Sequence, residues 1–229
     1  MMTLPLLISV PHAGRNVPEE ARPYCILTPQ QIVQDGDEGA GEIYDVGGSV
    51  ADFVTTDVAR AIVDVNRAED DRRADGVVKT HTCWNVPVYS EPLPEPLVEE
   101  LLARHHRPYH ARLTRPARGV RLGMDCHTMA ATAPPVGPDP GSARPHICLS
   151  DAGHTCPPPW LRQLALCLER AFETDVSVNE PFEGGHIIRA HCREIPWMQL
   201  ELSRAPFLPL AEKRLRVLDA LECLCTALF

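Results

Sequence analysis

Two histidines and several carboxylates stand where they could share one metal ion. His12 follows the apolar run 4–10, His127 follows a second apolar run, and an acidic turn at 35–38 and Glu201 supply carboxylates. Two imidazoles and one carboxylate bind Zn²⁺ through three protein ligands and leave a fourth position for water. The bound metal lowers the pKa of that water to about 7 and polarises a carbonyl group. These residue types therefore predict one zinc ion and hydrolytic chemistry.

Glu201 has a different role in this prediction. It lies in the apolar stretch MQLEL at 198–202, where a lone carboxylate is costly to bury. A carboxylate that does not bind the metal can take a proton from water and pass it to a leaving nitrogen. Glu201 is therefore the predicted general base. The alternative is a half-buried strand on which Glu201 alternates with leucines and faces solvent.

Two arginines predict a substrate that carries a carboxylate, because a planar guanidinium pairs bidentately with that group. Asn66 and Arg67 follow the apolar run 61–65, and Arg189 follows the sequence HII. Gly185 would let a ligand approach the backbone closely. The competing interpretations are a salt bridge from Arg67 to an acid at 69–71, an exposed strand position for Arg189, and a plain turn at Gly185.

Each of these features also has an ordinary interpretation. A histidine after a strand more often packs or caps than binds metal, and among ten histidines some such pair arises by chance. Acidic residues beside glycine usually form a solvated turn. On these grounds the choice among Asp35, Asp37 and Glu38 stays open. Only the combination of features predicts a site.

The candidate residues need a sheet whose strands end side by side. We expect strands at 4–10, 53–56, 61–65, 120–124, 147–149, 176–178, 186–190 and 197–202, and helices at 95–113, 157–172 and 208–229. This alternation predicts an α/β fold with a mixed, mostly parallel sheet, in which functional groups gather at the carboxyl ends of strands. A loop at 128–145, rich in Ala, Pro and Gly, is expected to be mobile beside the site.

Length and composition narrow the classes of protein. The 229 residues suit one domain over 1–229, and the net charge of −9 argues against general nucleic-acid binding. No apolar run approaches the roughly 20 residues that cross a membrane. The nine cysteines show no repeated CxxC spacing, so we expect no disulfide framework and a reducing, cytoplasmic setting. A monomer or small homo-oligomer is expected.

Six short stretches, in this order and spacing, resemble the N-formylglutamate amidohydrolase family. They are SVPHAG at 9–14, DVNR at 64–67, PYH at 108–110, DCHT at 125–128, NEPFEGG at 179–185 and QLE at 199–201. The resemblance covers the chain from about Ile8 to Phe207. It implies a three-layer αβα domain similar to the zinc carboxypeptidases and aspartoacylases, and a small carboxylate-bearing substrate.

The resemblance also implies roles by position. His12 and His127 match the zinc-binding histidines, and Asp37 is the choice within the acidic turn because Arg15 stands where carboxypeptidases place a glutamate. Glu201 matches the general base, and Asn66 with Arg67 matches the pair that holds a substrate carboxylate. The implied reaction converts N-formyl-L-glutamate to formate and L-glutamate, as in histidine degradation.

The sequence departs from the family pattern in two places. Gly39 and Gly41 stand in a stretch where a histidine and a second aspartate are usual, and His186 replaces a common tyrosine. These changes leave the predicted catalytic residues in place. The substrate is therefore expected from the family as a whole and not from these residues.

Two rival functions are compatible with the sequence. The first is a cysteine hydrolase that uses Cys126, Cys148 or Cys192 with a neighbouring histidine; adjacent Cys126 and His127 would face opposite sides of a strand, which argues against that pair. The second is a non-catalytic protein of the same fold that binds a carboxylate or a metal.

A chelator and a thiol reagent separate the two enzymatic hypotheses. We expect removal of zinc by a chelator to abolish hydrolysis of an N-acylated amino acid, and added Zn²⁺ to restore it, because the metal activates the attacking water. Initial rates measured before and after each treatment check this. Activity that survives the chelator but is lost on thiol alkylation would support the cysteine hydrolase instead.

Overall fold

The longest apolar strands form the centre of the sheet. The computed structural model describes residues 3–229, and β1 (Leu4–Val10), β3 (Leu122–Met129) and β6 (Trp197–Ser203) are buried along almost their whole length. Strands that are covered on both faces need such continuous apolar runs. β2 (Val50–Thr55), β4 (Ile147–Ser150) and β5 (Ser177–Val178) complete the order β2-β1-β3-β6-β4-β5. All pairs are parallel except β4 with β6.

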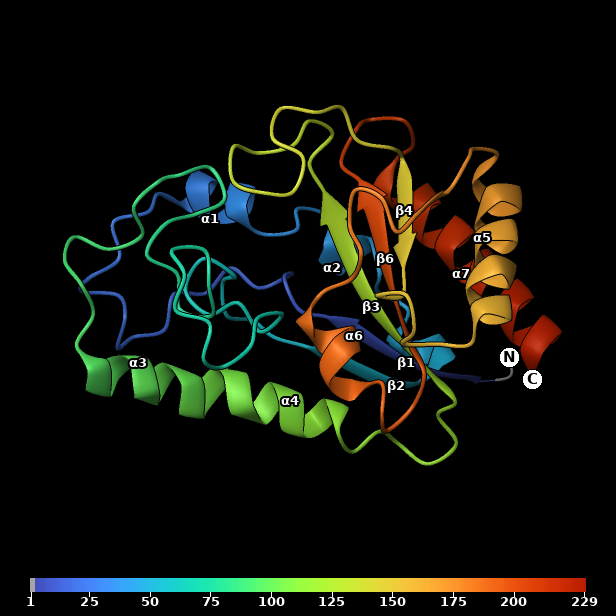
Figure 1. Ribbon diagram of the computed structural model, residues 1–229, viewed down its shortest axis with the longest axis horizontal. Helices are drawn as coiled ribbons and strands as arrows, with labels where there is room; N and C mark the ends of the chain where they lie inside the picture. The colour runs from blue at the N-terminus through green and yellow to red at the C-terminus, as the bar shows by residue number, and fades with distance from the viewer. Residues whose placement is uncertain (1–2) are drawn as a thin grey trace.

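Helices cover both faces of this sheet (Figure 1). One face packs against α2 (Ala40–Ile43), α5 (Pro158–Phe172) and α7 (Leu210–Leu228). The other packs against α6 (His186–His191) and the long helical segment of residues 95–113. The expected single α/β domain with three αβα layers and a mixed, mostly parallel sheet is confirmed.

The helix expected at 95–113 is confirmed, and it contains a π-helical turn. It comprises α3 (Glu95–Leu101), a π-helical turn η2 (Leu102–His106) and α4 (Arg107–Leu113), without a break in the chain direction. π-helical turns inside α-helices are rare and often mark functional positions. Two shorter helices, α1 (Pro29–Asp35) and the 3₁₀ turn η1 (Gly47–Ser49), precede β2.

Helices α5 and α7 lie side by side and are joined by a disulfide. Leu161, Leu164 and Leu168 recur at helical spacing on the buried side of α5. Cys167 of α5 and Cys223 of α7 form the bond, with their Cα atoms 6.0 Å apart. The sequence predicts no disulfide framework, and this one bond is the exception among the cysteines of the described residues; the other seven are free.

Three predicted elements differ from the structure. Residues 61–65 form buried turns and not a strand, because their apolar side chains pack among loops while the amide of Asp64 bonds to the carbonyl of Val77. Residues 186–190 form helix α6 and not a strand, since Ile187 and Ile188 in so short a run suit either structure. The strand expected at 120–124 begins at Leu122 and continues through His127 to Met129.

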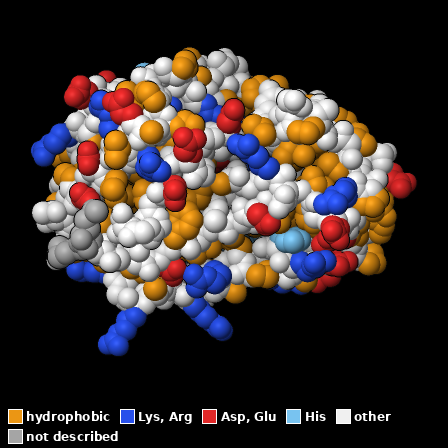
Figure 2. Space-filling view, turned by 180° about the vertical axis from the view of Figure 1, so that it is seen from behind, with side chains coloured by type: hydrophobic (Ala, Val, Ile, Leu, Met, Phe, Trp, Pro, Cys, Tyr) orange, Lys and Arg blue, Asp and Glu red, His pale blue; other side chains and the backbone are white. Residues whose placement is uncertain are grey.

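The surface agrees with ordinary globular composition. Acidic and basic side chains are interspersed among apolar ones on the face seen from behind (Figure 2). In the described residues 3–229, no helix combines the length and apolarity that a bilayer crossing needs.

Candidate active site

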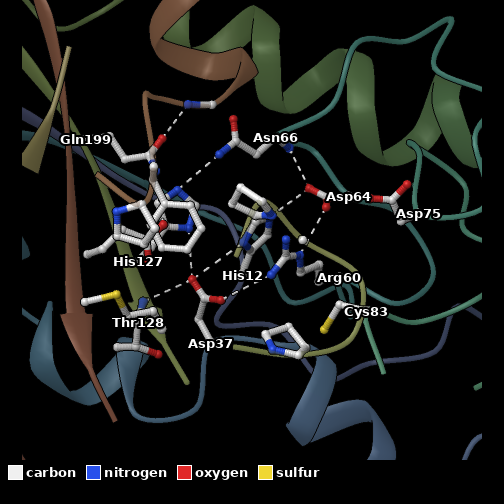
Figure 3. A pocket seen from close by; sticks show the side chains of 18 of the residues that line it. His12, Asp37, Arg60, Asp64, Asn66, Asp75, Cys83, His127, Thr128 and Gln199 are labelled. Atoms are coloured by element: carbon white, nitrogen blue, oxygen red, sulfur yellow. Dashed lines mark hydrogen bonds and ion pairs between the residues drawn. The ribbon is translucent and has the colours of Figure 1, made fainter. Parts of the chain in front are cut away.

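Three side chains from separate parts of the fold converge to form a potential metal centre. His12 follows β1, Asp37 follows α1, and His127 lies within β3. One ligand atom from each lies within 4.8 Å of the others, and all three residues are buried. In Figure 3 the Asp37 carboxylate lies between the two imidazoles. The structure therefore brings together the three predicted ligands.

His12 is oriented so that one ring nitrogen is left for a ligand. Its Nε2 lies 2.8 Å from Oδ1 of Asp64, and because a carboxylate only accepts, Nε2 carries the proton. Nδ1 then has a lone pair, and this buried atom has no hydrogen-bond partner. It faces Oδ2 of Asp37 at 3.5 Å. A buried nitrogen left unpaired in this way fits a metal ligand.

His127 is oriented by the same arrangement. Its Nε2 lies 2.9 Å from Oδ2 of Asp125, and its Nδ1 lies 2.9 Å from Oδ2 of Asp37. Both ring nitrogens of His127 thus face carboxylates. Burial alone would lower its pKa, but Asp125 and Glu201 raise the pKa well above the usual range, so both nitrogens carry protons here. A metal ion bound at Nδ1 would replace the proton on that nitrogen. Two Nδ1 atoms and one carboxylate form the N/N/O donor set that Zn²⁺ accepts in catalytic sites. The residues present thus fit the ion that the sequence predicts.

Both carboxylates next to His12 are held ionised. Burial by itself would raise the pKa of Asp37, but His12 and His127 lower it well below its usual range. Burial acts on Asp64 in the same way, and its pKa is also lowered well below the usual range by His12 and the nearby Arg60 and Lys79. A negatively charged Asp37 is suited to bind a metal ion, and a negatively charged Asp64 is suited to polarise the metal-binding imidazole of His12.

Within the acidic turn, only Asp37 points at the histidines. Asp35 accepts from Nζ of the buried Lys79 at 3.0 Å and from the amide of Cys83 at 2.7 Å. Glu38 is exposed, and its carbonyl oxygen accepts from the Thr128 hydroxyl. The geometry thus favours Asp37 among the three alternatives.

Glu201 lies beside His127 and lines the same cavity. The parallel pairing of β3 with β6 puts the Cα atoms of His127 and Glu201 opposite each other, so their side chains share one face of the sheet. Burial raises the pKa of Glu201, and Nε2 of Gln199 donates to its Oε1 at 3.0 Å. Glu201 therefore does not face solvent as the simpler interpretation held, and a carboxylate with a raised pKa is suited to accept a proton.

The site opens into a cavity of about 420 Å³ with many basic side chains on its walls. The cationic lining residues are Arg60, Arg67, Lys79, Arg144, Arg189 and Arg204. One wall comes from the loop after β3, including Pro134 and Val136. Cavities of this size commonly hold small ligands, and the cations select anionic ones.

Arg67 and Arg189 both line the cavity but have different partners. Nη2 of Arg67 pairs with Oδ2 of Asp75 at 3.2 Å, so its partner is none of the acids at 69–71. Arg189 lies on α6 and not on a strand, and its Nε donates to the carbonyl oxygen of Gly184 at 3.3 Å. Arg189 is exposed, as its simpler interpretation held, and it also lines the cavity, where it could meet an anion.

The side chain of Asn66 packs against the backbone of Gly185. Nδ2 of Asn66 donates to Oδ2 of Asp125 at 3.1 Å, and its Oδ1 accepts from the amide of Ile187 at 2.8 Å. A Cβ on Gly185 would lie 2.4 Å from Nδ2 of Asn66, so only glycine fits there. The close approach at Gly185 is thus to this side chain, and Asn66 braces the carboxylate that orients His127.

Sequence reasoning missed Arg60 and the roles of two aspartates. Nε of Arg60 donates to Oδ2 of Asp64 at 3.1 Å, and its Nη1 lies 3.6 Å from Oδ1 of Asp37. Burial lowers the pKa of Arg60, but Asp64 and Asp37 outweigh this and raise it. Asp64 and Asp125 stood inside the recognised stretches DVNR and DCHT, which was the available signal. Arg60 lies in a loop without any periodic signal.

The cysteine rival has no support in this geometry. Cys126 packs into the apolar core on the face of β3 opposite His127, and burial raises its pKa well above the usual range. Cys148 is buried too, and burial raises its pKa to about 11. A thiol with a raised pKa is a poor nucleophile. Of the cysteines, Cys83 lines the described cavity, whereas Cys126, Cys148 and Cys192 do not. Burial raises the pKa of Cys83 to about 11, so it is a poor nucleophile too.

Replacing Asp64 by Asn tests the orientation of His12. We expect Asp64→Asn to weaken zinc binding about 10- to 100-fold, since it removes the charge that polarises the imidazole. Competition with a chromogenic chelator measures the dissociation constant. Asp52→Asn is the matched control, because Asp52 pairs with Arg112 and does not line the cavity. Equal zinc affinity in all three proteins would rule out this role for Asp64.

Comparisons with known proteins agree on one family. The model of the N-formylglutamate amidohydrolase family matches residues 4–208. An N-formylglutamate deformylase of Pseudomonas putida is 28% identical over 225 residues, which cover 90% of this chain and 82% of that protein.

Solved structures show the same fold. A crystal structure of an N-formylglutamate amidohydrolase from Ralstonia eutropha JMP134 has a TM-score of 0.78 at 19% identity, covering 99% of this chain and 93% of that one. A gene product of Agrobacterium tumefaciens has a TM-score of 0.77 at 16% identity, covering 99% and 91%. The family model spans most of the chain, and on this ground the chain belongs to the N-formylglutamate amidohydrolase family.

Proposed function

We propose that this protein is a zinc-dependent amidohydrolase that cleaves N-formyl-L-glutamate to formate and L-glutamate. The observation that carries the proposal is the convergence of His12, Asp37 and His127 beside a buried glutamate that lines the same cavity. Membership of the family and the deformylase of P. putida support the choice of substrate. We extend the proposal to one catalytic domain over residues 1–229 and to a role in histidine degradation.

The metal would be held by Nδ1 of His12, Nδ1 of His127 and the carboxylate of Asp37. When bound, Zn²⁺ supplies a Lewis acid that polarises the formyl carbonyl and activates a water molecule. Asp64 and Asp125 hold the two imidazoles in the tautomers that this binding needs. These hydrogen bonds raise the basicity of the two histidines and fix the direction in which each ring points.

Glu201 would move the proton. Its raised pKa makes it a better base toward water than an exposed glutamate, because burial disfavours the charged form. It takes a proton from the attacking water as the new C–O bond forms. It then returns that proton to the amide nitrogen as the C–N bond breaks, so that formate and the amine of glutamate are released.

The arginines would bind and orient the substrate. Arg60, already turned toward Asp37, can stabilise negative charge that develops on the carbonyl oxygen. Arg67 lies 3.8 Å from Asp64 and would hold the α-carboxylate close to the scissile bond. Arg189, on α6 at the cavity wall, would meet the side-chain carboxylate. Two separate anion contacts would suit a dicarboxylate substrate.

Glu201→Gln separates catalysis from binding. We expect kcat to fall about 10²- to 10⁴-fold, because the amide cannot accept the proton, while zinc content stays at one ion per chain. Steady-state kinetics with N-formyl-L-glutamate and metal analysis of the same samples measure both. Glu38→Gln is the control, since the Glu38 side chain is exposed on the acidic turn.

The same experiment addresses the non-catalytic rival. A wild-type protein that binds zinc and N-formyl-L-glutamate but releases no formate would support a binding protein. A Glu201→Gln variant with full activity would show that another group moves the proton.

A further inference from the structure

Four histidines form a second cluster outside the metal centre. We call His106, His110, His186 and His191 the histidine cluster; the first two come from η2 and α4, and the others from α6. The ring centroid of His110 lies 4.4 Å from that of His106, 5.1 Å from His191 and 5.4 Å from His186. None of the four lines the described cavity, so a direct role in catalysis does not explain them.

The hydrogen bonds of this cluster run in one direction. Nε2 of His110 lies 2.9 Å from the carbonyl oxygen of Val65, and because a carbonyl only accepts, Nε2 carries the proton. Nδ1 of His110 therefore accepts from Nε2 of His191, at 2.8 Å. By the same reasoning, Nε2 of His106 donates to the carbonyl oxygen of Arg67 at 2.9 Å.

The two accepting carbonyls belong to the loop that carries Asn66 and Arg67. This loop lies outside the sheet, so no strand partner fixes its backbone. Its backbone is held by two backbone hydrogen bonds, from the amide of Asp64 to Val77 and from the amide of Arg67 to Asp64. Three side chains add to these: His110 at Val65, His106 at Arg67, and Asp64, whose Oδ1 accepts from the Asn66 amide at 2.9 Å. The i, i+4 spacing of His106 and His110 lets one helix face reach both carbonyls.

Burial lowers the pKa of three of these histidines and keeps His110 neutral at physiological pH. The pKa of His110 is lowered to about 3, mainly by burial and in part by the neighbouring His106 and His191. Burial also lowers the pKa of His186 and His191. A neutral His110 keeps the Nδ1 lone pair that accepts from His191, so the directed hydrogen bonds persist.

We propose that His110 and His106 are positioning residues that aim Arg67 at the substrate carboxylate by holding the carbonyls of Val65 and Arg67. This inference rests on the proposed function, in which Arg67 binds the α-carboxylate. Replacing either histidine should therefore lower kcat/KM for a substrate that has the α-carboxylate, and should lower it much less for a substrate that lacks this group.

The test compares two substrates on each variant. N-formyl-L-glutamate carries the α-carboxylate, and 4-formamidobutanoate lacks it but keeps the other carboxylate. The ratio of kcat/KM for the two substrates does not depend on how much of the protein is folded, because both meet the same active enzyme. We expect Arg67→Ala to lower this ratio about 100-fold, as loss of a charge-assisted contact does.

For His110→Phe and His106→Phe we expect a fall of roughly 3- to 10-fold in the ratio, mainly through a higher KM for N-formyl-L-glutamate, since one hydrogen bond that orients the loop is lost. His110→Gln should restore most of the ratio, because its amide can donate to Val65. His105→Phe is the matched control: His105 adjoins His106 but faces Glu20 at 3.5 Å.

Different failures point to different errors. If Arg67→Ala lowers the ratio while both phenylalanine variants keep it, the positioning role is wrong and the proposed function stands. If His110→Phe lowers the ratio and His110→Gln does not restore it, donation to Val65 is not the cause and the inference fails. If Arg67→Ala leaves the ratio unchanged, Arg67 does not bind the α-carboxylate, and this inference falls with that assignment.

Discussion

Two buried carboxylate–imidazole hydrogen bonds hold the candidate metal site in shape. Asp64 accepts from Nε2 of His12 and Asp125 accepts from Nε2 of His127, so that both Nδ1 atoms face Asp37. Without these bonds each ring could turn or protonate at the other nitrogen, and the candidate metal site would not be preformed. Arg60 lies beside both Asp37 and Asp64, and Lys79 lies 3.9 Å from Asp64, so cations partly offset the charge of these carboxylates.

The sheet supplies the precision of the site. Adjacent parallel strands put residues in register at fixed spacing, so Glu201 on β6 lies directly opposite His127 on β3. Asp125 lies two positions before His127 and therefore on the same face of the strand, within reach of its Nε2. The loops supply the groups that meet substrate, and these need bracing from outside the sheet. Asn66 provides such a brace, because it ties β3 to the start of α6.

Sequence reasoning could recover the parts of the site that depend on local pattern. His12 and His127 stand at or near strand ends marked by apolar runs, and Glu201 interrupts an apolar strand. Contacts between residues far apart in the chain leave no such local pattern in the sequence. Arg60 reaches the site from a loop, and the run 61–65 has strand-like composition only because its side chains are buried between loops. The choice of helix for residues 186–191 is set by packing on β3 and β6, which a six-residue pattern does not encode.

Anomalous scattering from crystals grown with Zn²⁺, measured on both sides of the zinc absorption edge, tests the central claim most directly. We expect one strong peak, about 2.0–2.2 Å from Nδ1 of His12, Nδ1 of His127 and a carboxylate oxygen of Asp37. Asp64 and Asp125 should keep their contacts with the two Nε2 atoms. A peak bound through Nε2 of either histidine, or an ion at another place while this site holds none, would contradict the account.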